Sequence, residues 1–467
     1  MQQTLKRTLY LSGGLFLVSL TGTPGFAKDK KAAPVAPPSE VMALYDLGQA
    51  PSPARIRRDI QTLVNFGTRH TLSETRSETR GIGAARRWIY AEFKRISKDC
   101  GDCLEVIYVR DTISGEKRIP NPTEVVNVIA IQRGVLDPGR YILMSGDIDS
   151  RVSDVMDFTS DSPGANDNAS GMAGVLEAAR VLSKHKFAGS IIYAGLSGEE
   201  QGLFGGKILA RYAQDHKWDV KAELNNDMIA NISGIDGVID NTTARVFSEG
   251  TRASETKAEA RDRRFRGGEV DSASRNLARY IKQTGEQYLT NLKVMMVYRL
   301  DRFRRGGHHR PFNAVGIPGV RIMEAHENYN RQHQNVRREN GIDYGDTMAG
   351  VNAEYAAKLT GLNIVTLARM ADAPPFPENV KLSGAVQASA RLEWTIPKGK
   401  KADNLMGYRV YWRLTTEPEW THTRYVGKVD HWVFNNLVVD NYFFGVAAVA
   451  KNGAETPVIF PGAAGRF

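Results

Sequence analysis

The sequence predicts an α/β protein with a doubly wound, mostly parallel sheet, followed by a small all-β sandwich. From about residue 42 to residue 372, apolar runs typical of buried strands alternate with segments that carry apolar residues at helical spacing. After residue 372 the helical periodicity stops, and short β-branched and aromatic runs follow one another between turn signals. We therefore expect two domains, at residues 42–372 and 373–467.

The helices and strands of the first domain alternate along the chain. Helical spacing is clear in GIGAARRWIYAEFKRIS and in SGMAGVLEAARVLSKH, at residues 81–97 and 170–185. The segments LEVIYV, EVVNVIAIQ and YILMSG, between these two stretches, and SIIYAGLS and KAELNND, after the second stretch, predict strands. Near-continuous apolar strands are typical of a parallel sheet with helices on both faces.

The second domain contains the short strand-like runs SARLEWTIP, MGYRVYWRL and NYFFGVAAVAKNG. Strands of this length separated by turns are typical of a β-sandwich. The pattern resembles a fibronectin type III module, with Trp394 at the position of the core tryptophan and Tyr442 at that of the corner tyrosine. This resemblance implies a module that binds the rest of the chain, or a surface protein or glycan.

The N-terminus predicts an exported protein. A short basic start, a mostly apolar segment and small residues around Ala27 are typical of a signal peptide at residues 1–27, with an uncleaved anchor as the alternative. Residues 28–41 form a Lys, Ala and Pro-rich linker. We expect a periplasmic or extracellular protein with no membrane span after signal cleavage, because no other apolar run is long enough.

The net charge and one basic stretch indicate which partners the protein could have, and the two cysteines indicate a disulfide. A net charge of +10 in an exported chain favours envelope anions or solubility, and we expect no nucleic-acid partner. The basic stretch at residues 251–268 predicts a solvated insertion or, alternatively, a positive rim that recruits acidic substrate tails. The two cysteines, in CGDC, predict a local disulfide between Cys100 and Cys103.

Acidic residues follow three of the predicted strands directly. They are Asp147 and Asp149, Glu199 and Glu200, and Asp227, and Asp167 lies in a loop that opens a helix. Ligands bind beyond the carboxyl ends of the strands in sheets of this kind. Gathered carboxylates resist joint ionisation unless a cation compensates them. The pattern therefore predicts a site with one or two divalent metal ions.

Four motifs resemble the co-catalytic dizinc exopeptidases, a family that includes secreted bacterial leucyl aminopeptidases. The motifs are GANDNASG, SGEEQGLFG, NNDM and YNRQHQ, and the resemblance covers roughly residues 50–370. It implies the zinc exopeptidase fold and a peptide substrate. It also implies a role for each matching residue: Asp167 bridges two metal ions, Glu199 is the general base, Glu200 and Asp227 each bind one ion, His333 is the terminal histidine ligand, and His309 lies near the substrate.

The sequence departs from the family pattern at two positions. Asp147 stands where the family usually has a histidine ligand, so an oxygen replaces a nitrogen at the metal, and Asp149 loses the histidine that it would orient. His308 stands where the family often has an aspartate. We hypothesise that His308 approaches Asp147 or the metal and rebalances the charge. The expected cofactors are two zinc ions, with Mn²⁺ or Co²⁺ as alternatives.

These observations predict a metallopeptidase that acts as an aminopeptidase through metal-activated water. A carboxypeptidase or dipeptidase of the same family is one alternative. A cyclising acyltransferase on the same fold is another, although such enzymes typically use one metal. An inactive relative that serves as a binding protein is favoured by Asp147 and disfavoured by the retained Glu199. The chain shows no GxSxG motif, and both cysteines lie in CGDC, so covalent catalysis has little support.

Overall fold

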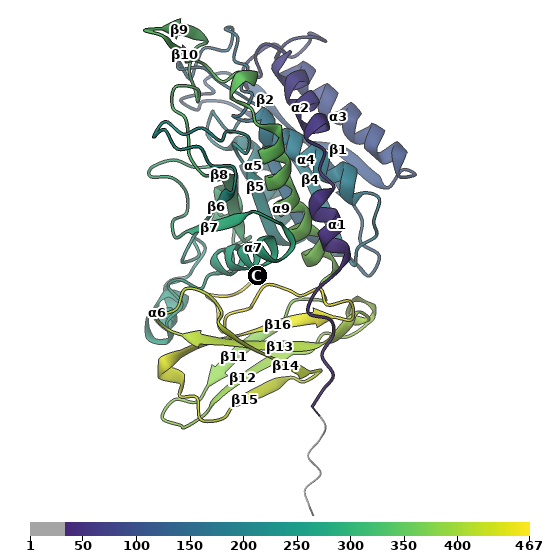
Figure 1. Ribbon diagram of the computed structural model, residues 1–467, viewed down its shortest axis with the longest axis vertical. Helices are drawn as coiled ribbons and strands as arrows, with labels where there is room; N and C mark the ends of the chain where they lie inside the picture. The colour runs from purple at the N-terminus through teal and green to yellow at the C-terminus, as the bar shows by residue number, and fades with distance from the viewer. Residues whose placement is uncertain (1–32) are drawn as a thin grey trace, which may run out of the picture. The chain divides into compact units, whose positions relative to one another are not determined.

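An eight-stranded sheet organises the first part of the chain in the computed structural model, which describes residues 33–467 (Figure 1). Its strands are β1 (Leu104–Ile113), β2 (Thr123–Gln132), β3 (Asp137–Asp147), β4 (Gly189–Leu196), β5 (Asp219–Asn226), β6 (Thr243–Ser248), β7 (Lys293–Val297) and β8 (Gly319–Glu324). The order across the sheet is β1-β2-β4-β3-β5-β8-β6-β7. The central strands β4, β3, β5 and β8 run parallel, which confirms the predicted fold class.

Helices pack on both faces of this sheet. They are α1 (Ala43–Gln49), α2 (Pro53–Val64), α3 (Gly81–Asp99), α4 (Ala169–Leu182), α5 (Phe204–Asp215), α7 (Ala273–Tyr288), α8 (His309–Ala314) and α9 (Ala353–Asp372). A further helix, α6 (Lys257–Arg266), buries no residue. Successive side chains of a strand point to opposite faces. Accordingly, Ile142 and Met144 of β3 share one apolar cluster with α4 and α9, while Leu143 belongs to a second cluster with α5 and α8.

The start of α4 packs directly against the end of β5, where several of the acidic residues gather. The side chain of Asn168 caps the helix by accepting a hydrogen bond from the backbone N–H of Gly171 at 3.0 Å. A Cβ atom on Gly171 would lie 2.2 Å from the carbonyl oxygen of Asn226. Because no side chain fits there, glycine at this position lets the helix bring Asp167 to the carboxyl ends of the strands.

The C-terminal part forms two three-stranded antiparallel sheets. Their strands are β11 (Glu378–Ser383), β12 (Ala390–Thr395), β13 (Leu405–Leu414), β14 (His422–Gly427), β15 (His431–Phe434) and β16 (Tyr442–Ala450), in the orders β11-β12-β15 and β14-β13-β16. Trp394 is buried and packs against Tyr408, with ring centroids 5.1 Å apart. The small all-β part is thus confirmed, whereas its membership of the fibronectin type III class stays a prediction.

The change from mixed to all-β structure falls between the end of α9 and the start of β11. Buried apolar side chains of both parts nevertheless belong to one continuous cluster, which contains Ile142 of β3 as well as Trp394 of β12. The division into two domains at residue 372 therefore stays a prediction. A buried ion-pair network also joins the parts, because Asp271, just before α7, accepts hydrogen bonds from Arg279 of α7 at 2.8 Å and from Arg413 of β13 at 2.8 and 2.9 Å.

Cys100 and Cys103 form the predicted disulfide at the end of α3. A hairpin of β9 (Arg337–Glu339) and β10 (Ile342–Tyr344) follows the loop that carries His333. Within residues 33–467 no helix has the length and apolar character needed to cross a bilayer, and the predicted signal peptide at residues 1–27 lies outside the described residues.

We expect Asp271→Ala to lower the free energy of unfolding by about 3–5 kcal/mol, because it leaves the buried guanidinium of Arg413 without its partner. Urea denaturation followed by circular dichroism measures the change. Asp262→Ala is the matched control, since it removes a solvent-exposed pair with Arg266 and should change stability by less than about 1 kcal/mol. Equal effects of the two substitutions would contradict a role for the buried network.

Candidate metal centre

The acidic residues predicted from the sequence lie at the carboxyl ends of three neighbouring parallel strands. Asp147 is the last residue of β3, Glu199 and Glu200 follow β4, and Asp227 directly follows β5. Asp167 precedes α4, and His333 lies on the loop after β8. The topology thus brings residues from distant parts of the chain to one edge of the sheet, as expected for a ligand site in a fold of this kind.

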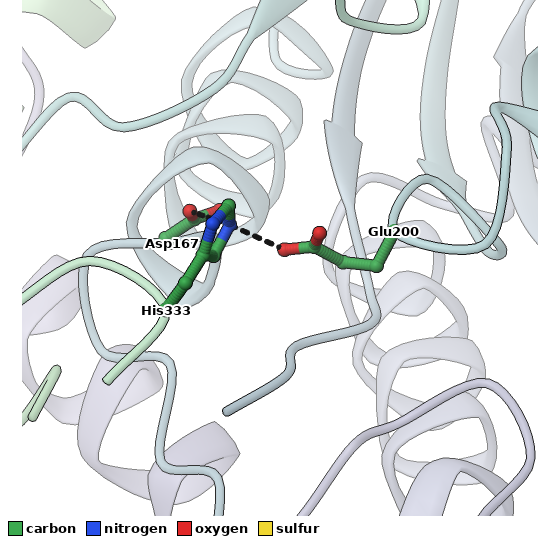
Figure 2. Close-up of side chains that lie close together, drawn as sticks. All are labelled: Asp167, Glu200 and His333. Atoms are coloured by element: carbon green, nitrogen blue, oxygen red, sulfur yellow. Dashed lines mark ion pairs between the residues drawn. The ribbon is translucent and has the colours of Figure 1, made fainter. Parts of the chain in front are cut away.

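Three of these side chains converge as potential metal ligands. The Nε2 atom of His333 lies 2.9 Å from Oδ2 of Asp167 and 2.9 Å from Oε1 of Glu200 (Figure 2). Within residues 33–467 this is the one group of three potential ligand residues whose donor atoms all lie within 4.8 Å of one another. One imidazole nitrogen and two carboxylate oxygens suit zinc and leave a fourth position open, so the residues fit a catalytic metal.

The short distances within this triad of Asp167, Glu200 and His333 shift the pKa values of its members. Burial opposes the charged imidazole, but Glu200 and Asp167 outweigh it and raise the pKa of His333 to about 9. Burial would raise the pKa of Asp167, yet His333 and a hydrogen bond from Gln332 hold that pKa below its ordinary range. Because a metal ligand must be deprotonated, binding of an ion to the triad would release the proton of His333.

Arg151 lies beside the triad and contacts two of its members. Its Nε atom is 2.7 Å from Oε2 of Glu200, and Nη2 is 2.6 Å from Nδ1 of His333. An ion on Nε2 of His333 would leave the ring proton on Nδ1. We therefore expect Arg151 to move away from Nδ1 when an ion binds and to remain paired with Glu200.

Asp147 and Asp227 are buried outside the triad, and each has one oxygen engaged. Oδ2 of Asp147 accepts a hydrogen bond from Asn168 at 2.8 Å, and Oδ2 of Asp227 pairs with Arg321 at 2.7 Å. Their Oδ1 atoms have no hydrogen-bond partner in the described part of the chain. Burial, followed by the charge of Asp227, raises the pKa of Asp147 well above its ordinary value. These free oxygens could accept a second cation, although the guanidinium of Arg321 already brings positive charge to the position.

His308 approaches Asp147, but it does not rebalance the charge, because burial lowers the pKa of this histidine to about 3 and keeps its ring neutral. The neighbouring His309 points elsewhere. Nε2 of His308 lies 3.6 Å from Oδ1 of Asp147, and its Nδ1 accepts a hydrogen bond from the backbone N–H of Gly206 at 3.1 Å. The neutral ring therefore carries its proton on Nε2 and faces Asp147 as a donor, not as a metal ligand. His309 is buried, and its Nε2 lies 2.8 Å from the carbonyl oxygen of Leu300.

Asp149 and Glu199 complete the set of predicted residues. Asp149 accepts hydrogen bonds from the backbone N–H groups of Glu199 and Glu200, at 3.2 and 3.1 Å, and from Thr71 at 3.0 Å. It therefore orients the loop that carries the two glutamates. The side chain of Glu199 lines the same crevice as the triad, and burial together with Glu200 raises its pKa well above the ordinary value.

The arginines of this region were not among the residues predicted from the sequence. Arg321 is buried within β8, and the segment RLDRFRRGGHHR at residues 299–310 supplies several more arginines to the crevice. The density of arginine in that segment was a usable signal. The basic stretch at 251–268, by contrast, contains α6, pairs Arg263 with Glu255, and contributes no residue to the crevice lining.

The sequence is similar to those of probable zinc metalloproteases. Residues 127–349 match the model of peptidase family M28. A probable zinc metalloprotease of Leptosphaeria maculans is 41% identical over 430 residues, which cover 91% of this chain and 97% of the relative. The chain belongs to peptidase family M28. A probable zinc metalloprotease of Pyricularia oryzae is also 41% identical, over 416 residues that cover 88% of this chain and 82% of the relative.

A solved structure shows the same M28 fold. The LapA aminopeptidase of Legionella pneumophila superimposes with a TM-score of 0.51 at 17% sequence identity, covering 72% of this chain and 77% of LapA. At this level of identity the likeness concerns the fold alone. It supports the assignment of the eight-stranded sheet and its helices to the M28 architecture.

We expect His333→Ala to weaken zinc binding by more than about 100-fold, because loss of a direct ligand exceeds the 10–100-fold effect of losing an outer hydrogen-bond partner. Titration against a competing chelator measures the affinity. His326→Ala is the matched control, since that partly exposed histidine pairs with Asp236, outside the triad. Unchanged zinc affinity in His333→Ala would exclude the triad as the metal site.

Proposed function

We propose that this M28 protein is a zinc-dependent exopeptidase, in first place an aminopeptidase that removes N-terminal residues from peptides. The observation that carries the proposal is the convergence of Asp167, Glu200 and His333 in a crevice that also contains Glu199. Zinc metalloprotease is also the name of the relatives that align with nearly the whole chain. The direction of cleavage is the part of the proposal that rests on the family resemblance of the motifs.

Different residues of the crevice have different roles in the proposed hydrolysis. A zinc ion held by Asp167, Glu200 and His333 would supply the Lewis acidity that activates water and polarises the scissile carbonyl. Glu199 accepts the proton of the attacking water and returns it to the leaving amine nitrogen. A pKa raised by burial suits a carboxylate that both takes and gives a proton near neutral pH. Asp149 holds Glu199 and Glu200 in their separate roles through the backbone of their loop.

We further propose that the two metal ions predicted from the sequence bind with unequal affinity. The first would be held by Asp167, Glu200 and His333. The second would use the free Oδ1 atoms of Asp147 and Asp227, where Arg321 and the N–H of His308 already lie close. A fixed guanidinium repels a divalent ion, so the second position should be the weaker one.

We also propose that the protein is exported and that its C-terminal part has a binding partner. A chain that begins with a signal peptide would act on peptides in the periplasm or the medium. The C-terminal sheets would then bind a surface protein or glycan, or serve the catalytic part alone through the contacts of Asp271 and Arg413. Zinc is the proposed resident metal, with Mn²⁺ or Co²⁺ as substitutes.

Glu199→Gln should lower kcat by about 10²–10⁴-fold, because it removes the proton acceptor and keeps the side-chain shape. The assay is hydrolysis of a panel of aminoacyl chromogenic substrates, with zinc content measured on the same samples. Zinc content should be unchanged in the variant. Wild-type activity equal to that of the variant would refute Glu199 as the base. A fully metal-loaded wild type without turnover on peptides would favour the binding-protein alternative.

Titration of zinc into metal-free protein should show two separate steps, the second weaker by at least about tenfold given the nearby guanidinium. Asp147→Asn should abolish only the second step, and Glu200→Gln should abolish the first. Calorimetry or a competing dye follows both steps. Two equivalent ions, or a loss of the first step in Asp147→Asn, would contradict the unequal assignment.

A further inference from the structure

The crevice that contains the triad is lined by more arginines than carboxylates. Its volume is about 550 Å³, and four carboxylates line it, those of Asp167, Glu199, Glu200 and Asp227. Six arginines line the same space, namely Arg118, Arg151, Arg302, Arg304, Arg305 and Arg310. A bound divalent ion would add to this positive excess. A pocket of this charge attracts anionic ligands and repels cationic ones.

Three of the six arginines are committed to acidic partners of the protein itself. Arg151 pairs with Glu200 at 2.7 Å. Arg302 and Arg305 both pair with Glu327, at 2.9 and 3.1 Å. These guanidinium groups serve as counter-charges inside the protein, because Glu200 and Glu327 are buried carboxylates that require one.

The other three arginines form no ion pair with any residue between 33 and 467. Arg118, on the loop between β1 and β2, donates a hydrogen bond to the backbone carbonyl of Glu200 at 2.6 Å. Arg304 precedes α8 and Arg310 lies in its first turn, and both are exposed at the crevice. We call Arg118, Arg304 and Arg310 the free arginine set. Its members enter the crevice from two separate segments of the chain.

We propose that the free arginine set binds a carboxylate of the substrate close to the scissile bond. This inference rests on the proposed peptidase function and specifies its substrate class. A guanidinium group presents a planar array of donors that matches a carboxylate, often through two parallel hydrogen bonds. The contact of Arg118 with the backbone of Glu200 places one such group beside the triad, within reach of a residue bound there.

Two kinds of peptide carry a carboxylate at this place. An aminopeptidase substrate would present the side chain of an N-terminal Asp or Glu. A carboxypeptidase or dipeptidase substrate would present the free C-terminal carboxylate. Both share the same recognition chemistry, and peptide derivatives that lack one carboxylate at a time distinguish them.

The test compares four peptides with one backbone: Glu-Ala-Ala-Ala and Gln-Ala-Ala-Ala, each with a free or an amidated C-terminus. Products are identified by mass spectrometry, and kcat/KM is measured for each peptide. We expect loss of the recognised carboxylate to lower kcat/KM by about tenfold or more, as for a charge-assisted hydrogen bond. Sensitivity to Glu against Gln identifies the side chain, and sensitivity to amidation identifies the C-terminus.

The matching variant is the triple substitution Arg118→Gln, Arg304→Gln and Arg310→Gln. It should abolish the preference for the carboxylate, so that kcat/KM falls at least about tenfold more for the peptide that carries this group than for the matched neutral peptide, because only the former loses a charged contact. Arg264→Gln is the control, since Arg264 is exposed in α6 and does not line the crevice. An equal loss on all four peptides, or a wild type indifferent to both carboxylates, would overturn the proposal.

A binding measurement separates this inference from the proposed function. Calorimetric titration of the zinc-loaded protein with L-glutamate and with L-glutamine, and with alanine and alaninamide, requires no turnover. Tighter binding of the compound that carries the extra carboxylate, lost in the triple variant, supports the inference even if no peptide is cleaved. Equal binding within each pair would refute it, whatever the activity on peptides.

Discussion

The gathering of buried carboxylates at one edge of the sheet is the constraint on which the site depends. Parallel strands β3, β4 and β5 end side by side, so the acidic residues that follow them are brought together although their negative charges repel one another. Each carboxylate then needs a proton, a donor or a cation. Different residues meet this requirement at each position. Asn168 and His308 face Asp147, and Arg321 pairs with Asp227. The oxygens and the imidazole of the triad are available to a metal ion.

The fixed cation, Arg321, and an exchangeable metal ion at the triad would therefore lie at different positions along this edge. Arg321 is fully buried in β8 and contacts Asp301 as well as Asp227, so its charge is permanent. The three members of the triad come instead from two loops and a helix start, and the cation that they could hold is exchangeable. Arg321 therefore compensates part of the acidic edge independently of any ion that the triad could hold.

The sequence predicted the fold and the acidic ligands because both follow from local pattern. Strand and helix periodicity determine the sheet, and the position of a carboxylate after a strand determines the edge at which it lies. Arg321 could not be predicted, because its partner Asp227 is 94 residues away and only the pairing of β5 with β8 brings them together. The direction of the His309 side chain toward the carbonyl oxygen of Leu300 depends on the first turn of α8, which the sequence pattern does not determine.

The continuous apolar cluster has a consequence for the integrity of the chain. Arg140 donates hydrogen bonds to the carbonyl oxygens of Met370 and Ala373, so the end of α9 is held to β3 directly before the all-β part begins. Phe376, between α9 and β11, is buried in the same cluster. A protease that cut this connection would leave two fragments still associated through apolar surface. Shortening the gene at the same point would instead expose that surface and produce an aggregation-prone product.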